Sequence, residues 1–281
     1  MISVVSGGVA PAVMRCDITQ TRPLGREPSY ETTDITLPPP FAAWFAERGW
    51  RPHAHQIRLL ANAGQGGADL LIAPTGAGKT LAGFLPSLID LAADPSRRQG
   101  HAGSTRPKGQ LHTLYISPLK ALAADIRRNL STPIEEMGLA IRVEDRTGDT
   151  KSHIRARQRV DPPDILLTTP ESLALLLAQE HAPSLFGALQ TVIIDEIHAL
   201  AGLKRGDQLA LCLARLRTLA SGHRRVGLSA TVEAPQVLAD WLEPGRARLV
   251  YADPGPEPDI RILEEAGDPP WAGMGGRYAA T

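Results

Sequence analysis

Short apolar runs alternate with amphipathic segments along most of this chain. Strands are predicted where a short apolar run occurs or where apolar residues alternate with polar ones. These segments are 70–73, 114–116, 139–144, 165–167, 192–194, 225–228 and 248–251. Helices are predicted at 41–48, 52–63, 80–93, 119–136, 207–220 and 237–242, with a basic helix after residue 149 and another helix from residue 170. Strands that alternate with helices predict an α/β fold, with a parallel sheet covered by helices on both faces.

The periodic pattern has limits at both ends of the chain. Residues 1–35 mix Gly, Pro, Thr and charged residues without a sustained period, so we expect a flexible leader there. One domain is predicted over residues 36–252. Residues 253–281 are rich in Pro, Gly and acid, and we expect them to be a linker.

Composition narrows the function classes only a little. Hydrophobic residues make up 43% of the 281 residues, and no apolar run approaches the ~18 residues of a membrane span, so no membrane partner is expected. The two cysteines, Cys16 and Cys212, form no pair typical of a zinc site or disulfide framework, and cytoplasm is the default location. The formal net charge is zero, so any nucleic-acid contact must come from local patches.

A glycine-rich turn joins the first predicted strand to the next helix. Its sequence from Ala73 to Thr80 is APTGAGKT, a variant of the phosphate-binding loop that has Ala where the strict pattern has Gly. The glycines let backbone N–H groups point at an anion, the lysine suits the β- and γ-phosphates, and the threonine hydroxyl suits Mg²⁺. The predicted nucleotide-binding residues are Thr75, Gly76, Ala77, Gly78, Lys79 and Thr80. The alternative is a strand-to-helix turn without a ligand.

Two acids follow the apolar run at 192–194. Ligands bind at the carboxyl ends of strands in open parallel sheets, so Asp195 is predicted to hold Mg²⁺ and Glu196 to orient and deprotonate the attacking water. Together with Lys79 they are the predicted catalytic residues. The alternative is that both acids cap the next helix, from Ile197 onward.

His198 lies three residues after the first acid and has no second ligand at metal spacing. We therefore predict that it couples the nucleotide site by hydrogen bonding to the turn at the end of the run 225–228. The coupling residues are then His198, Ser229 and Thr231. Capping of the following helix by the two hydroxyl residues remains an alternative.

The motifs APTGAGKT, DEIH at 195–198 and SAT at 229–231 resemble motifs I, II and III of superfamily 2 helicases. Gln56 resembles the Q motif, which implies that its amide reads adenine. The order and spacing match over about residues 37–250, and the resemblance implies a RecA-like P-loop NTPase fold. The phrases LPPPFAAWFAERGW, TLYISPLKALAADI and DEIHALAGLKRGDQLALCLARL are similar to the Lhr (large helicase-related) family, most of all to its ligase-associated members.

The resemblance also implies where a strand is held. The segment SPLKAL from Ser117 looks like motif Ia, and TGD from Thr147 and TTPES from Thr168 look like the later strand-tracking motifs. In the family, motif Ia and the TPE stretch lie on the opposite edge from the nucleotide. Backbone N–H groups near Leu119 and Glu171 can bind strand phosphates. The predicted nucleic-acid contacts are Pro118, Lys120, Gly148, Thr169, Pro170 and Glu171. The alternative for these segments is ordinary helix initiation. Residues 204–206 are predicted as a solvated loop or a DNA contact.

The function implied is that of the first, ATP-binding motor domain of a DEXH-box DNA helicase. ATP and Mg²⁺ are the implied cofactors, and single-stranded or partly duplex DNA is the implied partner, with 3′-to-5′ movement and a repair role beside a DNA ligase. We expect the chain to be an N-terminal fragment that precedes a second RecA-like domain with arginine fingers, and to bind nucleotide weakly without unwinding alone. The alternatives are a nucleotide-dependent nucleic-acid-binding module, or RNA as the strand.

Overall fold

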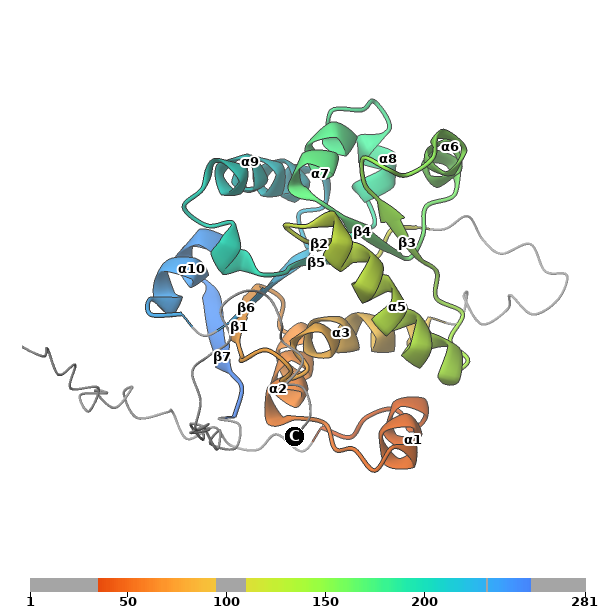
Figure 1. Ribbon diagram of the computed structural model, residues 1–281, viewed down its shortest axis with the longest axis vertical. Helices are drawn as coiled ribbons and strands as arrows, with labels where there is room; N and C mark the ends of the chain where they lie inside the picture. Colours follow the sequence, from red (N-terminus) through yellow and green to blue (C-terminus); the bar gives the residue numbers. More distant parts are fainter. Residues whose placement is uncertain (1–34, 95–109, 231, 254–281) are drawn as a thin grey trace, which may run out of the picture. The chain divides into compact units, whose positions relative to one another are not determined.

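The computed structural model describes residues 35–94, 110–230 and 232–253, which form an α/β domain (Figure 1). Seven strands in this range form one parallel sheet in the order β3-β4-β2-β5-β6-β1-β7, which confirms the predicted fold class. Their bounds are β1 Ala68–Ile72, β2 Thr113–Ile116, β3 Val143–Arg146, β4 Ile165–Thr168, β5 Thr191–Ile194, β6 Arg224–Ser229 and β7 Ala247–Tyr251. The predicted leader and linker fall almost wholly outside the described residues.

Helices connect these strands and begin where the sequence supplies a start signal. Pro39, Pro170 and Pro235 occupy first helical positions, where the missing N–H costs nothing. The helices are α1 Pro39–Glu47, α2 Ala54–Ala63, α3 Lys79–Ala93, α5 Lys120–Glu136, α6 Ser152–Val160, α7 Pro170–Leu177, α8 Ala182–Phe186, α9 Lys204–Leu219 and α10 Pro235–Leu242, with a 3₁₀ turn η1 at Ile197–Ala199. Among the described helices, none is long and apolar enough to cross a membrane.

The sheet separates two hydrophobic cores. Successive residues of a strand point to opposite faces, so Leu70 belongs to the core that includes residues of α7, α8, α9 and α10, whereas Leu71 belongs to the core that includes residues of α1, α2, α3 and α5. Figure 1 shows these two groups of helices on either side of the sheet. Both faces of the central strands are buried, as expected for a parallel sheet. This explains the continuous apolar runs in β1 and β5, whereas β6 begins with two buried arginines.

Three predicted segments differ from the structure. The strand predicted at 139–144 begins only at Val143, because Leu139 and Ile141 bury their side chains from a turn closed by Ile141 N–H donating to the Leu139 carbonyl. The helix from Ile197 onward that the capping alternative assumes is a single 3₁₀ turn. Residues 204–206 form the first turn of α9 and not a loop, and α8 has no counterpart in the prediction.

The carboxyl ends of the parallel strands lie at one edge of the sheet, which we call the carboxyl edge. Ile72 pairs with Ser229, and Ile116 pairs with both Ile194 and Thr168, so the strands end nearly level. The phosphate loop, acid pair and SAT turn lie over the β5-β6-β1 half, and the three strand-tracking segments lie over the β3-β4-β2 half. The two groups therefore share one edge and divide it, which corrects the expectation of opposite edges.

Gly227 tests how tightly the sheet packs. A Cβ there would lie 3.0 Å from Leu70 Cδ1 and 3.1 Å from Leu242 Cδ2, so these side chains would have to shift to admit a larger residue. We expect Gly227→Val to lower the free energy of unfolding by about 1–3 kcal/mol, measured by urea denaturation. Gly222→Val, at a position with no atom within 4 Å of a new Cβ, is the control. Equal losses in both variants would contradict close packing at β6.

Candidate functional site

The phosphate loop curls through two left-handed glycines. Gly76 has φ +84° and Gly78 has φ +71°, a region that other L-residues rarely adopt. Gly78 immediately precedes α3, so the loop ends at a helix N-terminus, where N–H groups and the helix dipole favour an anion. Lys79 is buried, and its Nζ donates to the carbonyls of Ala73 at 2.9 Å and Pro74 at 3.2 Å. The loop therefore holds its cation beside the place where an anion would bind.

The acid pair follows β5, next to that loop. The Tyr115 hydroxyl donates to the Asp195 carboxylate, and Glu196 N–H donates to Asp195 Oδ1 at 3.0 Å. Burial, with the nearby carboxylate, holds the pKa of Tyr115 far above its ordinary value, so the phenol stays a donor. Asp195 is thus fixed by groups from two neighbouring strands. Tyr115 was not predicted, because a tyrosine inside an apolar run reads as a core residue.

Glu196 adopts a strained backbone conformation. Its φ of +46° is the only positive value at a non-glycine residue among those described, and such a conformation costs about 1–3 kcal/mol. His198 Nε2 lies 3.3 Å from the Glu196 carboxylate, and His198 Nδ1 lies 3.0 Å from Ser229 Oγ. The predicted contact between the histidine and the SAT turn is therefore present. Its coupling role stays a prediction, and Thr231 lies outside the described residues.

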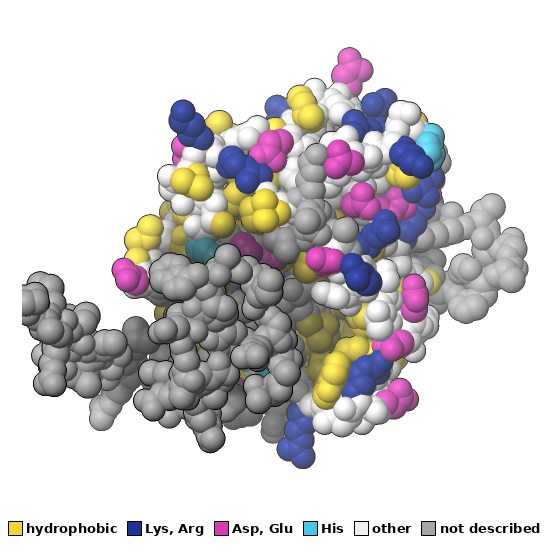
Figure 2. Space-filling view, in the orientation of Figure 1, with side chains coloured by type: hydrophobic (Ala, Val, Ile, Leu, Met, Phe, Trp, Pro, Cys, Tyr) yellow, Lys and Arg dark blue, Asp and Glu magenta, His cyan; other side chains and the backbone are white. Residues whose placement is uncertain are grey.

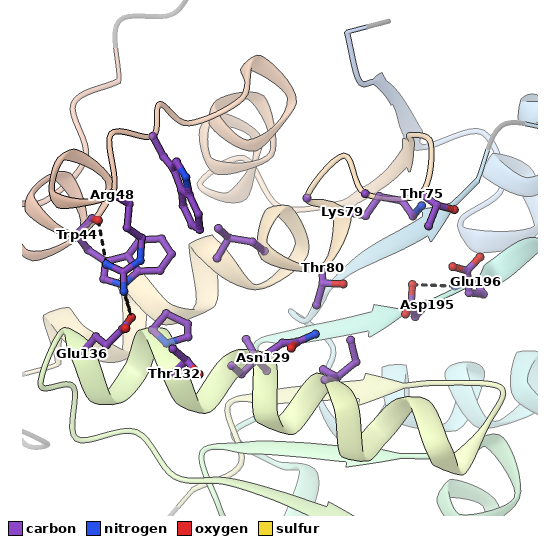
Figure 3. A pocket seen from close by; sticks show the side chains of 17 residues that line it. Trp44, Arg48, Thr75, Lys79, Thr80, Asn129, Thr132, Glu136, Asp195 and Glu196 are labelled. Atoms are coloured by element: carbon purple, nitrogen blue, oxygen red, sulfur yellow. Dashed lines mark hydrogen bonds and ion pairs between the residues drawn. The ribbon is translucent and has the colours of Figure 1, made fainter. Parts of the chain in front are cut away.

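A pocket of about 610 Å³ contains the phosphate loop and the acid pair together (Figure 3). The predicted residues that line it are Thr75, Gly76, Gly78, Lys79, Thr80, Asp195 and Glu196. Figure 3 shows Thr80 and Asp195 on neighbouring elements, with the Lys79 side chain above them in the view and beside Thr75. Ala77 and Gln56 are absent from the lining of this pocket. The loop and the acids thus meet across one cavity.

Gln56 lies behind the phosphate loop and is buried. Its Oε1 accepts a hydrogen bond from His53 N–H at 2.9 Å, and its Nε2 donates to the Gly78 carbonyl at 3.5 Å. The amide therefore joins the start of α2 to the phosphate loop. The reading of adenine by this amide stays a prediction.

The far end of the pocket was not predicted. It is formed by α1, the residues after it, and the last turns of α5, with Trp44, Arg48, Trp50 and Glu136 in the lining. Trp44 Nε1 donates to Glu136 Oε2 at 2.8 Å, and the Arg48 guanidinium lies 4.5 Å from the centre of the Trp44 ring. The contact between Trp44 and Glu136 joins positions 92 residues apart, and no local pattern signals it.

The strand-tracking segments present mostly backbone. Pro118, Thr169 and Pro170 are buried, and the Thr169 hydroxyl accepts from Ser172 N–H at 3.4 Å to cap α7. Gly148 lies in a turn, and Lys120 is the first residue of α5. The predicted contacts therefore lie at helix starts and turns on the carboxyl edge, where backbone N–H groups are available to phosphates. Their binding to a strand stays a prediction.

A parallel sheet with a phosphate loop after β1 and an acid pair after β5, both at its carboxyl edge, defines a nucleotide-binding core of the P-loop NTPase class. A protein-family model described as DEAD/DEAH box helicase matches residues 53–239. Because this match covers more than half of the chain, the chain belongs to the DEAD/DEAH box helicase family.

Within that family the predicted resemblance to Lhr helicases is confirmed. The chain is 43% identical over 242 residues to the Lhr helicase/probable uracil glycosylase of Mycolicibacterium smegmatis, covering 79% of this chain and 15% of that protein. It is 40% identical over 251 residues to the Lhr helicase/uracil glycosylase of Escherichia coli, covering 84% and 16%. The chain therefore spans about a sixth of these relatives, and membership of the ligase-associated branch stays a prediction.

Solved structures show the same fold. The structure of Mycobacterium smegmatis helicase Lhr bound to ssDNA and AMP-PNP matches with a TM-score of 0.68 and 38% identity, over 76% of this chain and 27% of that one. The DUF1998 helicase MrfA bound to DNA matches with a TM-score of 0.64 and 28% identity, over 79% and 31%. These findings confirm the predicted RecA-like fold.

Tyr115→Phe tests the hydrogen bond to Asp195. Removing the hydroxyl leaves a buried carboxylate oxygen without its donor, so we expect the free energy of unfolding to fall by about 1–3 kcal/mol in urea denaturation. In an Asp195→Ala background the same change should cost much less, because its partner is gone. An equal cost in both backgrounds would show that the hydroxyl acts elsewhere.

Proposed function

We propose that this chain is the ATP-binding first motor domain of an ATP-dependent DEXH-box DNA helicase, which couples ATP hydrolysis to movement on single-stranded DNA. The supporting observation is that Lys79, Thr80 and the acid pair line one pocket (Figure 3). Its volume of about 610 Å³ lies within the roughly 300–1,000 Å³ typical of ligand sites.

Phosphate binding would fall to the glycine loop and Lys79. The ammonium group already donates to two loop carbonyls, so it is held in place before any ligand arrives. A triphosphate oxygen is a stronger acceptor than a neutral carbonyl, because the bond is then charge-assisted on both sides. Exchange of these partners would move the cation onto the phosphates without leaving a buried charge unpaired.

The residues present fit Mg²⁺ bound together with a nucleotide. No group of three or more His, Cys, Asp or Glu suited to a metal occurs among the described residues, so a site built from protein alone is not indicated there. Mg²⁺ is usually held by one or two carboxylates, waters and substrate phosphates. Thr80 and Asp195 would hold it here, and the ion would supply positive charge against the phosphates.

Water activation would fall to Glu196. It lines the pocket beside Asp195, and its backbone has a left-handed conformation. His198 contacts both Glu196 and Ser229, so a movement of the SAT turn would be felt at the base. This contact supports the proposed coupling between the nucleotide site and the rest of the motor.

A DNA strand would bind along the other half of the carboxyl edge. Basic and acidic side chains are interspersed over the described part of the face in Figure 2, so attraction must come from specific groups and not from a single-sign surface. The helix starts at α5 and α7 supply backbone N–H groups for this purpose. The DNA preference is inferred from the Lhr relative bound to ssDNA. The repair role and the ligase partner remain part of this proposal.

Lys79→Ala should weaken the binding of a fluorescent ATP analogue to this chain by at least about tenfold, because the loop loses its only cation. The measurement is a fluorescence anisotropy titration in the presence of Mg²⁺. Lys151→Ala, which removes an exposed lysine at the start of α6, is the matched control and should change affinity little. Unchanged affinity in Lys79→Ala would overturn the phosphate assignment.

Glu196→Gln should leave nucleotide binding intact and lower the DNA-stimulated ATPase rate of the complete protein by roughly 10²–10⁴-fold. Glutamine keeps nearly the same shape as glutamate but cannot act as a general base. The rate is measured with and without single-stranded DNA, and with RNA in place of DNA. Nucleotide binding without DNA-stimulated turnover in the unsubstituted protein would instead support the alternative, a nucleotide-dependent binding module.

A further inference from the structure

Arg205, in the first turn of α9, connects the segment before α5 with the first turn of α7, which are distant in sequence. Its Nε donates to Glu171 Oε1 at 2.6 Å, and its Nη2 donates to the Pro118 carbonyl at 2.8 Å. Pro118 lies between β2 and α5, and Glu171 lies at the start of α7 after β4. A single planar guanidinium therefore spans the two helix starts expected to face the strand.

Stability alone does not account for this contact. The side chains of Arg205 and Glu171 are 41% and 50% exposed, and an exposed ion pair contributes roughly 0.2–1 kcal/mol. Its hydrogen bond to Arg205 lowers the pKa of Glu171, so the acid stays charged and paired near neutral pH. An unpaired acid at a surface that binds phosphates would repel DNA, whereas Glu171 is paired with Arg205.

The first turn of α9, which carries Arg205, packs closely against the preceding chain. A Cβ at Gly206 would lie 2.1 Å from the Leu200 carbonyl oxygen, so only glycine lets α9 begin this close to the chain. Leu200 follows the η1 turn that holds His198. The backbone at Arg205 is thereby held against the segment that follows the acid pair. From this position its guanidinium contacts the Pro118 carbonyl and the Glu171 carboxylate.

We propose that Arg205 is a positioning residue that sets the spacing between the α5 and α7 helix starts, so that their backbone N–H groups meet successive phosphates of one strand. The Glu171 carboxylate acts as the internal partner of this fork and makes no contact with the strand. The proposal rests on the proposed function, because it needs a strand on this half of the carboxyl edge. It differs from a direct phosphate contact by Arg205, in which Glu171 would only compete with the DNA.

Two substitutions separate the positioning role from a direct phosphate contact. The two roles predict opposite signs for the change in DNA affinity caused by Glu171→Ala. The assay is fluorescence anisotropy of labelled oligothymidylate with the 281-residue chain and a non-hydrolysable ATP analogue. Glu171→Ala should weaken DNA binding by about threefold to tenfold if it anchors the fork, although it removes a negative charge. Arg205→Lys should weaken binding similarly, because an ammonium keeps the charge and loses the planar fork.

Matched controls make the same kinds of substitution without touching the fork. Arg215→Lys and Glu180→Ala change exposed residues on α9 and just after α7, and each should shift DNA affinity by less than about twofold. Binding of the ATP analogue should be unchanged in all four variants, which shows that each folds.

The outcomes are distinct. Unchanged affinity in Arg205→Lys, together with unchanged or tighter binding in Glu171→Ala, would overturn the positioning role in favour of a direct phosphate contact or none. Absence of DNA binding by the unsubstituted chain would overturn the proposed strand-facing edge, and this inference with it. Weaker binding in both fork variants, with both controls unaffected, would support the proposal.

Discussion

The register between the central parallel strands is the constraint on which the functional edge depends. Ile72 pairs with Ser229 and Ile116 pairs with Ile194, so strands from distant parts of the chain end nearly level. A slip of one residue would turn every side chain of a strand to the opposite face. Because both faces carry separate apolar cores, such a slip is strongly disfavoured, and the loops that follow the strands are brought together with little freedom.

Buried partners prepare the polar groups of the nucleotide site. The Lys79 ammonium donates to two loop carbonyls, and the Asp195 carboxylate accepts from the Tyr115 hydroxyl. Each buried charged group therefore has hydrogen-bond partners in a region of low dielectric. Glu196 adopts its left-handed backbone conformation directly after β5, which is fully buried. Such preorganisation reduces the rearrangement needed when a charged ligand binds.

Arginine forks hold the segments on the other half of the edge. Arg155 Nε donates to the Thr150 carbonyl at 2.6 Å and its Nη2 to the Thr147 carbonyl at 3.2 Å, which braces the turn that contains Gly148. Arg205 does the same for the segments after β2 and β4. Lysine could not replace either side chain, because its single ammonium lacks the separated, coplanar donors of a guanidinium. Loop geometry on this half is therefore set by tertiary contacts.

The sequence by itself determined the strand, loop and helix order, the phosphate loop and the acid pair, because glycine conformation and apolar periodicity act over a few residues. Only the tertiary structure decided that Tyr115 serves Asp195, that Trp44 meets Glu136 and that Arg205 joins two loops. The first two contacts cross 80 and 92 residues of sequence, and Arg205 lies 87 residues from Pro118 and 34 from Glu171. All of them depend on how the sheet and helices pack and leave no local pattern. The strand predicted at 139–144 begins only at Val143 for the same reason, since the apolar residues Leu139 and Ile141 pack a turn against the core.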